Sequence, residues 1–307
     1  MKKSCRPFSR TECLAMTEES CSFDNNLVFK FHGFILVNYK TNKIFRLGFI
    51  NVSDTLFGTV SKSPSVKENI MCMITISKEI KEMYDSQYSD NTEEWRKIGA
   101  IGKVQNIIDL TKDLEINKII DIGAGDGNVL SLLSENNYCS EFTAVEISDS
   151  AIIQIKKKKI PGLIEIKQFD GYNLPFKDKQ FDLAICTHVI EHVEHPRKLL
   201  KEIKRISKKQ VFEVPIDFSF QVDKKFKHFN SYGHINIFTP GLFNFLLYTE
   251  GFKILNNKYA LYNKEVVCFS NKKLSINYLK TMIKRFVLKT IPPLMRIKPN
   301  TYTVLTE

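Results

Sequence analysis

The glycine-rich run from Lys118 to Asn128, KIIDIGAGDGN, constrains the fold of this 307-residue chain more than any other stretch. It begins with a short apolar segment typical of a buried strand, and its glycines then mark a tight turn into a helix that starts near Asn128. Glycine adopts backbone angles closed to other residues and lets a ligand approach without an intervening side chain. In open α/β sheets, a glycine-rich turn after the first strand binds nucleosides. The run therefore predicts an α/β domain with a nucleoside site at this turn.

The spacing of the glycines distinguishes this turn from a dinucleotide site. Gly123, Gly125 and Gly127 form G-x-G-x-G, and Asp121 stands two residues ahead of them. A dinucleotide fingerprint needs G-x-G-x-x-G instead. The observed pattern resembles the first motif of the class I S-adenosylmethionine (SAM) dependent methyltransferases. The resemblance implies a Rossmann-like α/β fold, a seven-stranded mixed sheet with helices on both faces, and SAM as the cofactor. It also implies that the last predicted strand, TYTVLTE, runs antiparallel and lies between the fifth and sixth strands of the domain.

Two further segments follow at the intervals that this family shows. Glu146 ends the second predicted strand about twenty residues past the turn, where an acidic side chain accepts hydrogen bonds from both ribose hydroxyls. The alternative is an ordinary exposed glutamate at a strand end. Asp170 and Gly171 follow the third predicted strand, where the family binds adenine, and PFKDKQFD over residues 175–182 resembles its P-F-x-D-x-x-F-D run. The resemblance implies a donor site built from Asp121, Gly123, Ala124, Gly125, Gly127, Glu146, Ile147, Asp170, Gly171 and Thr187.

The segment THVIEHVEHP after the fourth predicted strand admits three interpretations. His188, Glu191 and His192 spell H-x-x-E-H, which some zinc peptidases carry on a helix. Here the motif follows a strand and shows no obvious third ligand, so we expect no metal site. The same residues could instead fix the loop and the helix start. In the family fold this loop faces the methyl group, and the resemblance then implies that Thr187 and His188 line the donor and that His192 takes a proton from the acceptor.

A second candidate base lies in FNSYGHINIFTP, which resembles an H-x-x-x-F-T-P segment of the acceptor pocket in related enzymes. His234 would take the proton there, and the alternative is that His234 only holds its loop. Methyl transfer from a sulfonium is a direct displacement, in which the protein mainly aligns the acceptor with the methyl group. A hydroxyl acceptor must also lose its proton, and a general base typically adds about 10²–10⁴-fold. The histidine-rich surroundings therefore favour an oxygen acceptor.

The chain predicts three regions around this core. Residues 1–72 form an N-terminal extension, in which two β-prone runs predict a hairpin or small β unit. The alternatives are that the segment is poorly ordered, or that it is dispensable because Met71 or Met73 is the natural start. Residues 73–115 predict a helical lid with a Y-D-x-x-Y element at Tyr84 and Tyr88. The resemblance implies that Tyr88 covers the donor, and the alternative is that both tyrosines only pack the lid. Residues 116–307 form the SAM-binding domain, with an insertion over 271–300.

Composition narrows the location and the partners. The seven cysteines are scattered without C-x-x-C spacing, as expected of free thiols in a reducing compartment. The start lacks the apolar core of a secretory signal, and no uncharged apolar run approaches membrane-spanning length, so we expect a cytoplasmic protein. The net charge of +11 is explained either by solvated lysines or by attraction to an anionic partner.

Part of that excess lies in the insertion, LSINYLKTMIKRFVLKTIPPLMRIK, where apolar residues alternate with basic ones. The pattern fits a substrate cover, an amphipathic helix on an anionic membrane, or a helix that packs on the core. On the membrane interpretation, weak association with an anionic surface would make a lipid-linked saccharide a plausible acceptor.

We therefore predict a SAM-dependent methyltransferase that methylates a hydroxyl of a small molecule or a glycan. One alternative is a methyltransferase that acts on RNA or protein. The sequence THVI at 187–190 replaces the N/D-P-P-Y/F tetrapeptide that marks amino-group modification of bases, so we expect no specific nucleic-acid partner. A second alternative is a non-catalytic SAM-binding subunit whose basic surface recruits a partner.

Overall fold

The computed structural model describes residues 36–38, 43–45, 78, 81–82, 85, 88, 93–218, 222, 229, 233–270 and 275–307. The chain divides into two compact units, Met1–Met71 and Cys72–Glu307. In the first unit, β1 (Leu36–Asn38) and β2 (Lys43–Phe45) pair antiparallel at the position of the predicted hairpin. The remainder of the extension predicted over residues 1–72 lies outside the described residues.

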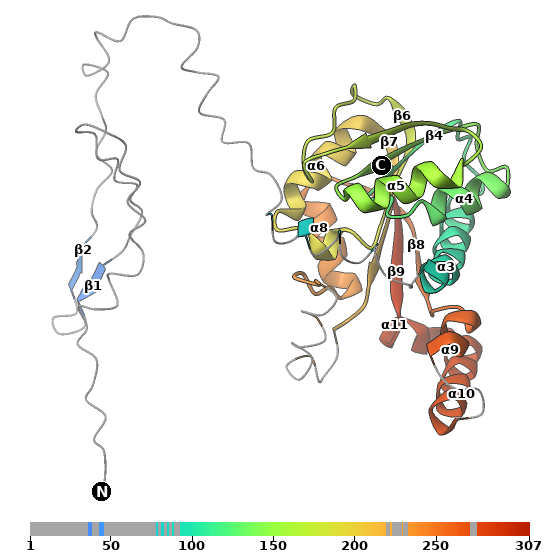
Figure 1. The fold of residues 1–307 in the computed structure, drawn as a ribbon. Helices are drawn as coiled ribbons and strands as arrows, with labels where there is room; N and C mark the ends of the chain where they lie inside the picture. The colour runs from blue at the N-terminus through green and yellow to red at the C-terminus, as the bar shows by residue number, and fades with distance from the viewer. Residues whose placement is uncertain are drawn as a thin grey trace, which may run out of the picture. The chain divides into compact units, whose positions relative to one another are not determined.

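A seven-stranded mixed sheet forms the centre of the second unit, as the sequence predicts (Figure 1). Its strand order is β5-β4-β3-β6-β7-β9-β8, and β9 runs antiparallel to both of its neighbours. Strand β9 comes last along the chain and lies between β7 and β8, which are the fifth and sixth strands of this sheet in chain order. This position confirms the implied topology. The strands are β3 (Lys118–Ile122), β4 (Glu141–Glu146), β5 (Leu163–Gln168), β6 (Phe181–Thr187), β7 (Ser207–Pro215), β8 (Ile254–Ala260) and β9 (Thr301–Thr306).

Helices cover both faces of this sheet. The apolar run of β3 supplies both cores, because Ile119 belongs to one buried cluster while Ile120 and Ile122 belong to the other. A central parallel strand that is buried on both faces needs such a continuous apolar run. One cluster is covered by α3 (Glu93–Thr111), α4 (Asn128–Glu135) and α5 (Asp149–Lys158), and the other by α6 (Pro196–Ile206) and α8 (Pro240–Thr249).

The start signals of α6 and α8 are visible in the sequence. Each helix has proline in its first turn, where the missing N–H would have no partner in any case. In α8 the hydroxyl of Thr239 also caps the helix, because it accepts from the backbone N–H of Leu242 at 3.1 Å. These helices place the loops that precede them at the carboxyl ends of the parallel strands.

Helix α3 lies within the segment predicted to be a lid, and it packs into the core. Val104, Ile107 and Leu110 are buried in the cluster that α3 shares with α4 and α5. Their spacing of three residues places them on one face of the helix. The second half of the predicted lid therefore forms part of the framework of the domain. Of residues 73–92, the structure describes only 78, 81–82, 85 and 88.

Three helices connect β8 to β9 along the chain, and they extend beyond the end of that strand pair (Figure 1). They are α9 (Lys264–Ser270), α10 (Ile276–Thr290) and α11 (Pro292–Ile297). The helical segment thus starts at Lys264, ahead of the insertion predicted over residues 271–300. Among the helices that the structure describes, none is both long and apolar enough to cross a membrane.

Candidate active site

The glycine-rich turn after β3 requires glycine at three positions. Gly123, Gly125 and Gly127 have φ values of +70°, +56° and +77°, which side chains rarely adopt. A Cβ atom on Gly123 would lie 2.6 Å from Cγ2 of Val189, and one on Gly125 would lie 2.7 Å from the Tyr88 hydroxyl. The absence of side chains at the first two glycines therefore lets Val189 and Tyr88 pack closely against the turn. Gly127 instead allows close packing, because a Cβ atom there would lie 3.2 Å from Cγ1 of Ile155 in α5 and 3.1 Å from Cδ1 of Ile160 in the loop that follows.

Glu146, at the end of β4, holds this turn in place. Its Oε2 accepts from the N–H of Gly125 at 2.7 Å, and its Oε1 accepts from the N–H groups of Ile147 and Ser148 at 2.8 and 3.1 Å. Burial raises the pKa of Glu146, and these three bonds oppose that rise. An ionised carboxylate offers about four lone-pair positions, so roughly one is left for a ligand hydroxyl. The predicted ribose contact to Glu146 is compatible with this geometry and stays a prediction.

A small cavity opens between the glycine turn, the end of β4 and the loop after β6. It gathers residues that are far apart in the sequence and that were singled out as site residues. These are Tyr88, Gly123, Glu146, Ile147, Gly171, His188 and His192, and the cavity is completed by Phe169, Val189 and Val193.

Other predicted donor residues lie outside this cavity lining. Asp121 is buried in β3, and burial, together with Glu146, raises its pKa to about 7 against the opposing effect of Lys103. The carboxylate of Asp170 accepts from the backbone N–H groups of Tyr172 and Asn173 at 2.9 and 2.6 Å and so shapes its own turn. Thr187 is buried at the end of β6. Donor contacts by these three residues stay predictions.

The lid segment is tied to the turn by charged groups. The Tyr88 hydroxyl lies over Gly125, and burial raises the pKa of Tyr88. The Arg96 guanidinium lies 5.1 Å from the centre of the Tyr88 ring, and Arg96 Nε donates to Asp126 Oδ2 at 2.8 Å. The carboxylate of Asp85 accepts from Ser148 Oγ at 2.6 Å, next to Glu146. Tyr84, the other tyrosine of the predicted element, lies outside the described residues.

His188 has a backbone conformation that is uncommon for a residue with a side chain. Its φ is +58°, and its N–H donates to the backbone oxygen of Glu213 at 2.8 Å. Its Nε2 lies 3.2 Å from Glu213 Oε1, and its Nδ1 lies 3.4 Å from Glu191 Oε1. His188 is therefore held between two buried carboxylates. This geometry also excludes the zinc-peptidase arrangement, because His188 and His192 do not share an α-helix.

The carboxylate of Glu213, at the carboxyl end of β7, has hydrogen-bond partners on α3 and β9 as well as His188. It accepts from Asn106 Nδ2 of α3 at 2.8 Å and from Thr303 Oγ1 of β9 at 2.7 Å. Burial opposes ionisation of Glu213, but the hydrogen bonds from His188, Thr303 and Asn106 outweigh it and lower its pKa to about 2. A negative charge is thus fixed beneath the histidine loop.

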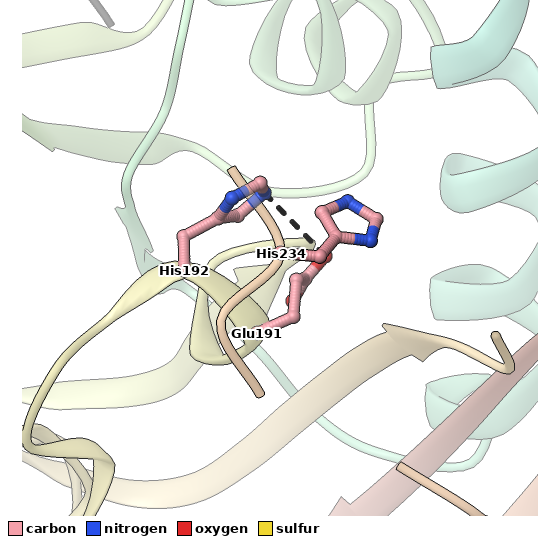
Figure 2. A group of neighbouring side chains, drawn as sticks. All are labelled: Glu191, His192 and His234. Atoms are coloured by element: carbon pink, nitrogen blue, oxygen red, sulfur yellow. Dashed lines mark ion pairs between the residues drawn. The ribbon is translucent and has the colours of Figure 1, made fainter. Parts of the chain in front are cut away.

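Glu191, His192 and His234 come together at the cavity edge, as Figure 2 shows. Glu191 is fully buried, and burial raises its pKa to about 7. His192 Nδ1 donates to the Gly233 carbonyl at 3.0 Å, and burial and the neighbouring His234 lower the pKa of His192 to about 3. Burial opposes protonation of His234, but its 2.6 Å contact with Asp217 and the charge of Glu191 outweigh burial and raise its pKa.

Asn236 explains how His234 reaches a turn that is distant in sequence. Its side chain donates to the carbonyl oxygens of Ile190 and Val193 at 3.2 and 2.7 Å. The backbone N–H groups of Ile235 and Asn236 both donate to the Glu191 carbonyl at 2.9 Å. The turn that carries His192 and the segment that carries His234 are thereby held together, and the rings of these two histidines meet edge to face with centres 4.8 Å apart.

Comparisons with known proteins identify a methyltransferase domain in the central part of this chain. Residues 120–212 match the family model described as a methyltransferase domain. The demethylmenaquinone methyltransferase of Thermotoga maritima is 26% identical over 117 residues, 38% of this chain and 47% of that protein. A ubiquinone/menaquinone biosynthesis C-methyltransferase of Campylobacter jejuni is 28% identical over 129 residues, 41% of this chain and 52% of that protein. The match thus spans about half the length of these relatives.

A solved structure shows the same fold. One chain of the complex between the Haloferax volcanii Trm112 methyltransferase activator and a methyltransferase superposes with a TM-score of 0.56 at 11% identity. The superposition covers 73% of this chain and 96% of that chain. The fold and the glycine turn define a Rossmann-like methyltransferase domain of class I. Residues 120–212 therefore carry a methyltransferase domain, and the described residues around them complete its class I Rossmann-like fold.

Proposed function

We propose that this chain binds SAM in the cavity beside Gly123 and transfers its methyl group to a hydroxyl oxygen of a small molecule or saccharide. The observation that carries the proposal is that the Gly123 turn, Glu146 and His192 line one cavity. When bound, SAM supplies an activated methyl group for direct displacement. The residues fit such a ligand, because Gly123 lines the cavity without a side chain to occupy it and Glu146 faces the same cavity.

The roles of the chain's own residues follow from their positions. Glu146, with lone-pair capacity remaining, would accept from the ribose, and Gly171 and Phe169 would line the adenine end of the cavity. Tyr88 would cover the donor and exclude water, since it is already packed over Gly125. His188 and His192 line the same cavity, and His234 packs against His192, so these histidines would orient the acceptor and handle its proton.

Of the three histidines, His234 has the hydrogen-bond partner that a general base needs. Its Nδ1 is 2.6 Å from Asp217 Oδ2, which fixes the ring and directs Nε2 as the proton-accepting atom of the neutral form. His192 lines the cavity and lies between His234 and the donor end. His188, held between Glu191 and Glu213, would position the loop against the donor. These assignments rest on geometry.

Carbon methylation is a second candidate, favoured by the relatives. Both relatives described above carry quinone-related names, and one is named a C-methyltransferase. A ring carbon beside a phenol becomes nucleophilic when the phenol loses its proton, so the same histidine cluster could serve either acceptor atom. The position of the new methyl group distinguishes the two functions.

The test is to incubate the full chain with methyl-labelled SAM and fractionated extract, and to identify the labelled product by mass spectrometry and NMR. Label on an oxygen of a small molecule or glycan supports the first proposal, and label on a ring carbon supports the second. Label on RNA or protein would support that alternative instead. SAM binding by calorimetry without any labelled product would favour a non-catalytic subunit.

We also propose that the chain works in the cytoplasm and contacts the surface of an anionic membrane there. Helix α10 exposes an apolar stripe in which Ile276, Ile283 and Phe286 are 64–69% accessible, at spacings of seven and three residues. Lys280 and Lys289 are exposed on the same helix. An apolar face flanked by lysines suits the surface of a membrane with anionic lipids.

Flotation with phosphatidylserine vesicles at low salt tests this contact. Phe286→Asp should reduce the bound fraction several-fold, while Tyr248→Asp, a change at an exposed aromatic residue of α8, should leave it unchanged. If the unmodified chain does not float with these vesicles, the membrane contact is wrong.

A further inference from the structure

Glu191, His192 and His234 each direct one ligand atom into a common space. These three atoms lie within 4.8 Å of one another, and the three side chains gather in one place (Figure 2). Glu191 and His192 come from the short helical turn at Ile190–His192, and His234 comes from the segment that Asn236 holds against it. The cluster is thus assembled from two loops that are fixed together.

The carboxylate of Glu191 is the first sign of an electropositive ligand. The residue is fully buried, and neither of its oxygens accepts a hydrogen bond from any described residue. His188 Nδ1 and His192 Nε2 approach Oε1 at 3.4 and 3.8 Å, which is too long or poorly aligned for hydrogen bonds. A buried carboxylate without hydrogen bonds is costly, and coordination of a cation is one of the ways in which proteins compensate that cost.

The orientation of the two histidine rings is the second sign. His192 Nδ1 lies 3.0 Å from the Gly233 carbonyl oxygen, and His234 Nδ1 lies 2.6 Å from Asp217 Oδ2. Each Nδ1 therefore carries the proton that it donates, and each Nε2 carries the lone pair of the neutral ring. Histidines that bind metals almost always donate their other ring N–H to a carbonyl or carboxylate in this way.

We propose that Glu191, His192 and His234 bind a divalent transition-metal ion, and that Zn²⁺ matches the site best. Imidazole ligands suit zinc and other transition metals, whereas sites for Mg²⁺ and Ca²⁺ are built mainly from oxygen atoms. Two histidines and one carboxylate are a common ligand set of zinc sites that keep a further position open. Asp217 and the Gly233 carbonyl support the ligands from behind.

The distances need only a small adjustment. With Zn–N and Zn–O bonds of about 2.0–2.2 Å in a tetrahedral site, ligand atoms lie about 3.4 Å apart. His192 Nε2 is now 3.8 Å from Glu191 Oε1. Because the three ligand atoms already lie within 4.8 Å of one another, closing the site requires any pair of them to approach by at most about 1.4 Å.

The place of the metal deepens the proposed function and rests on it. His192 lines the donor cavity as well as the cluster, so the open coordination position would lie on the acceptor side of that cavity. An acceptor oxygen held there would lose its proton more readily, because a bound cation stabilises the negative form. The rings of His192 and His234 would then hold the ion, and the proton of the acceptor would pass to solvent water and not to these rings.

The experiment measures metal binding directly on the full chain and without SAM. Purified protein is stripped with a chelator, dialysed, and titrated with Zn²⁺ by calorimetry, and Co²⁺ loading is followed by visible absorption. We expect one site per chain that Glu191→Gln and His234→Ala each weaken by at least about 100-fold. Asp217→Asn should weaken it about 10- to 100-fold, as loss of a supporting hydrogen bond does in other metal sites.

Matched controls come from the same loop. Glu194→Gln and His195→Ala change an exposed glutamate and an exposed histidine that lie outside the cluster, and both should bind Zn²⁺ like the unmodified chain. Thermal unfolding of each metal-free variant checks that it is folded. The inference is overturned if the unmodified chain binds no Zn²⁺, or if the folded Glu191→Gln and His234→Ala variants bind it as well as the controls do.

A parallel SAM titration separates this inference from the proposed function. If SAM binds to the stripped protein while Zn²⁺ binds nowhere that depends on Glu191, the metal site is wrong and the SAM binding that the proposed function requires is supported. If Zn²⁺ binds at the cluster while SAM does not bind, the metal site stands and the proposed function is wrong.

Discussion

Arg96 Nε donates to Asp126 Oδ2 at 2.8 Å, and this bond joins helix α3 to the glycine-rich turn. Both side chains are largely buried, with 16% and 7% of their surfaces accessible. The same guanidinium packs on the ring of Tyr88, so one residue links the lid, the turn and the framework of the domain. The pair therefore gives a direct way to loosen the cover of the donor cavity.

Arg96→Met should lower both stability and SAM affinity. The change removes a charge-assisted hydrogen bond of about 1.5–3 kcal/mol and the support of Tyr88. Asp126 keeps Lys158 at 3.8 Å as a weaker partner, which limits the loss. Urea unfolding and SAM calorimetry measure the two effects. Lys97→Met, an exposed position one residue away on α3, is the control, and equal behaviour of both variants would contradict the role of Arg96.

Gly125→Ala should abolish SAM binding with a moderate loss of stability. The new Cβ meets the Tyr88 hydroxyl at 2.7 Å and needs a φ of +56°, a combination that forces the lid and the turn apart. Gly102→Ala provides the opposite case in α3, where nothing lies within 4 Å of the new atom and helix propensity favours alanine by roughly 0.5–1 kcal/mol. Calorimetry with SAM should therefore show binding by the second variant and none by the first.

Asp121 should make the ligand-free protein less stable as the pH rises from about 4 to 7. Its pKa in the folded state is raised to about 7, so the folded state holds a proton that the unfolded state releases at lower pH. The unfolded state then binds fewer protons, and stability falls with pH across that window and no further above it. The difference is a few kcal/mol at most, by order of magnitude.

Asp121→Asn removes this dependence, so the variant should gain stability relative to the unmodified protein as the pH rises from 5 to 8. Urea unfolding at several pH values measures it, and Asp113→Asn, an exposed change on the loop after α3, should show no such gain. A constant difference between Asp121→Asn and the unmodified protein at all pH values would refute the prediction.

Glu213→Gln should destabilise the protein most above pH 5. The pKa of Glu213 is lowered to about 2 by its hydrogen-bond donors, so its carboxylate stabilises the folded state above its unfolded pKa, and this contribution is lost as the pH falls toward 2. The gap between the variant and the unmodified protein should therefore narrow below about pH 4.5. Thermal unfolding at pH 7 and pH 3 checks this, and a gap that widens in acid would exclude it.

The fold was predictable because its signals are local. The apolar run before Gly123, the glycine spacing and the proline-led starts of α6 and α8 each act over a few residues, and the structure places them as expected. The antiparallel β9 followed from family resemblance, since nothing in TYTVLT itself indicates its place between β7 and β8.

The site was predictable only in part, because its remaining partners are distant in sequence. His192 and His234 were singled out from their motifs, but their edge-to-face contact depends on Asn236 and its bonds to the Ile190–Val193 turn. Asp217 had no signal beyond its position shortly after β7. Asn106 and Arg96 lie on a helix whose apolar periodicity predicts packing and says nothing about polar residues that point inward.

The insertion of β9 between β7 and β8 has a consequence for how the domain is made. β8 has no described strand neighbour other than β9, and Thr303 of β9 supplies a hydrogen bond to Glu213 beneath the histidine loop. During synthesis, β8 cannot join the sheet and that bond cannot form until residues 301–306 have left the ribosome. The donor half of the domain can assemble before β9 is made, whereas the floor of the acceptor half is completed only once β9 has emerged.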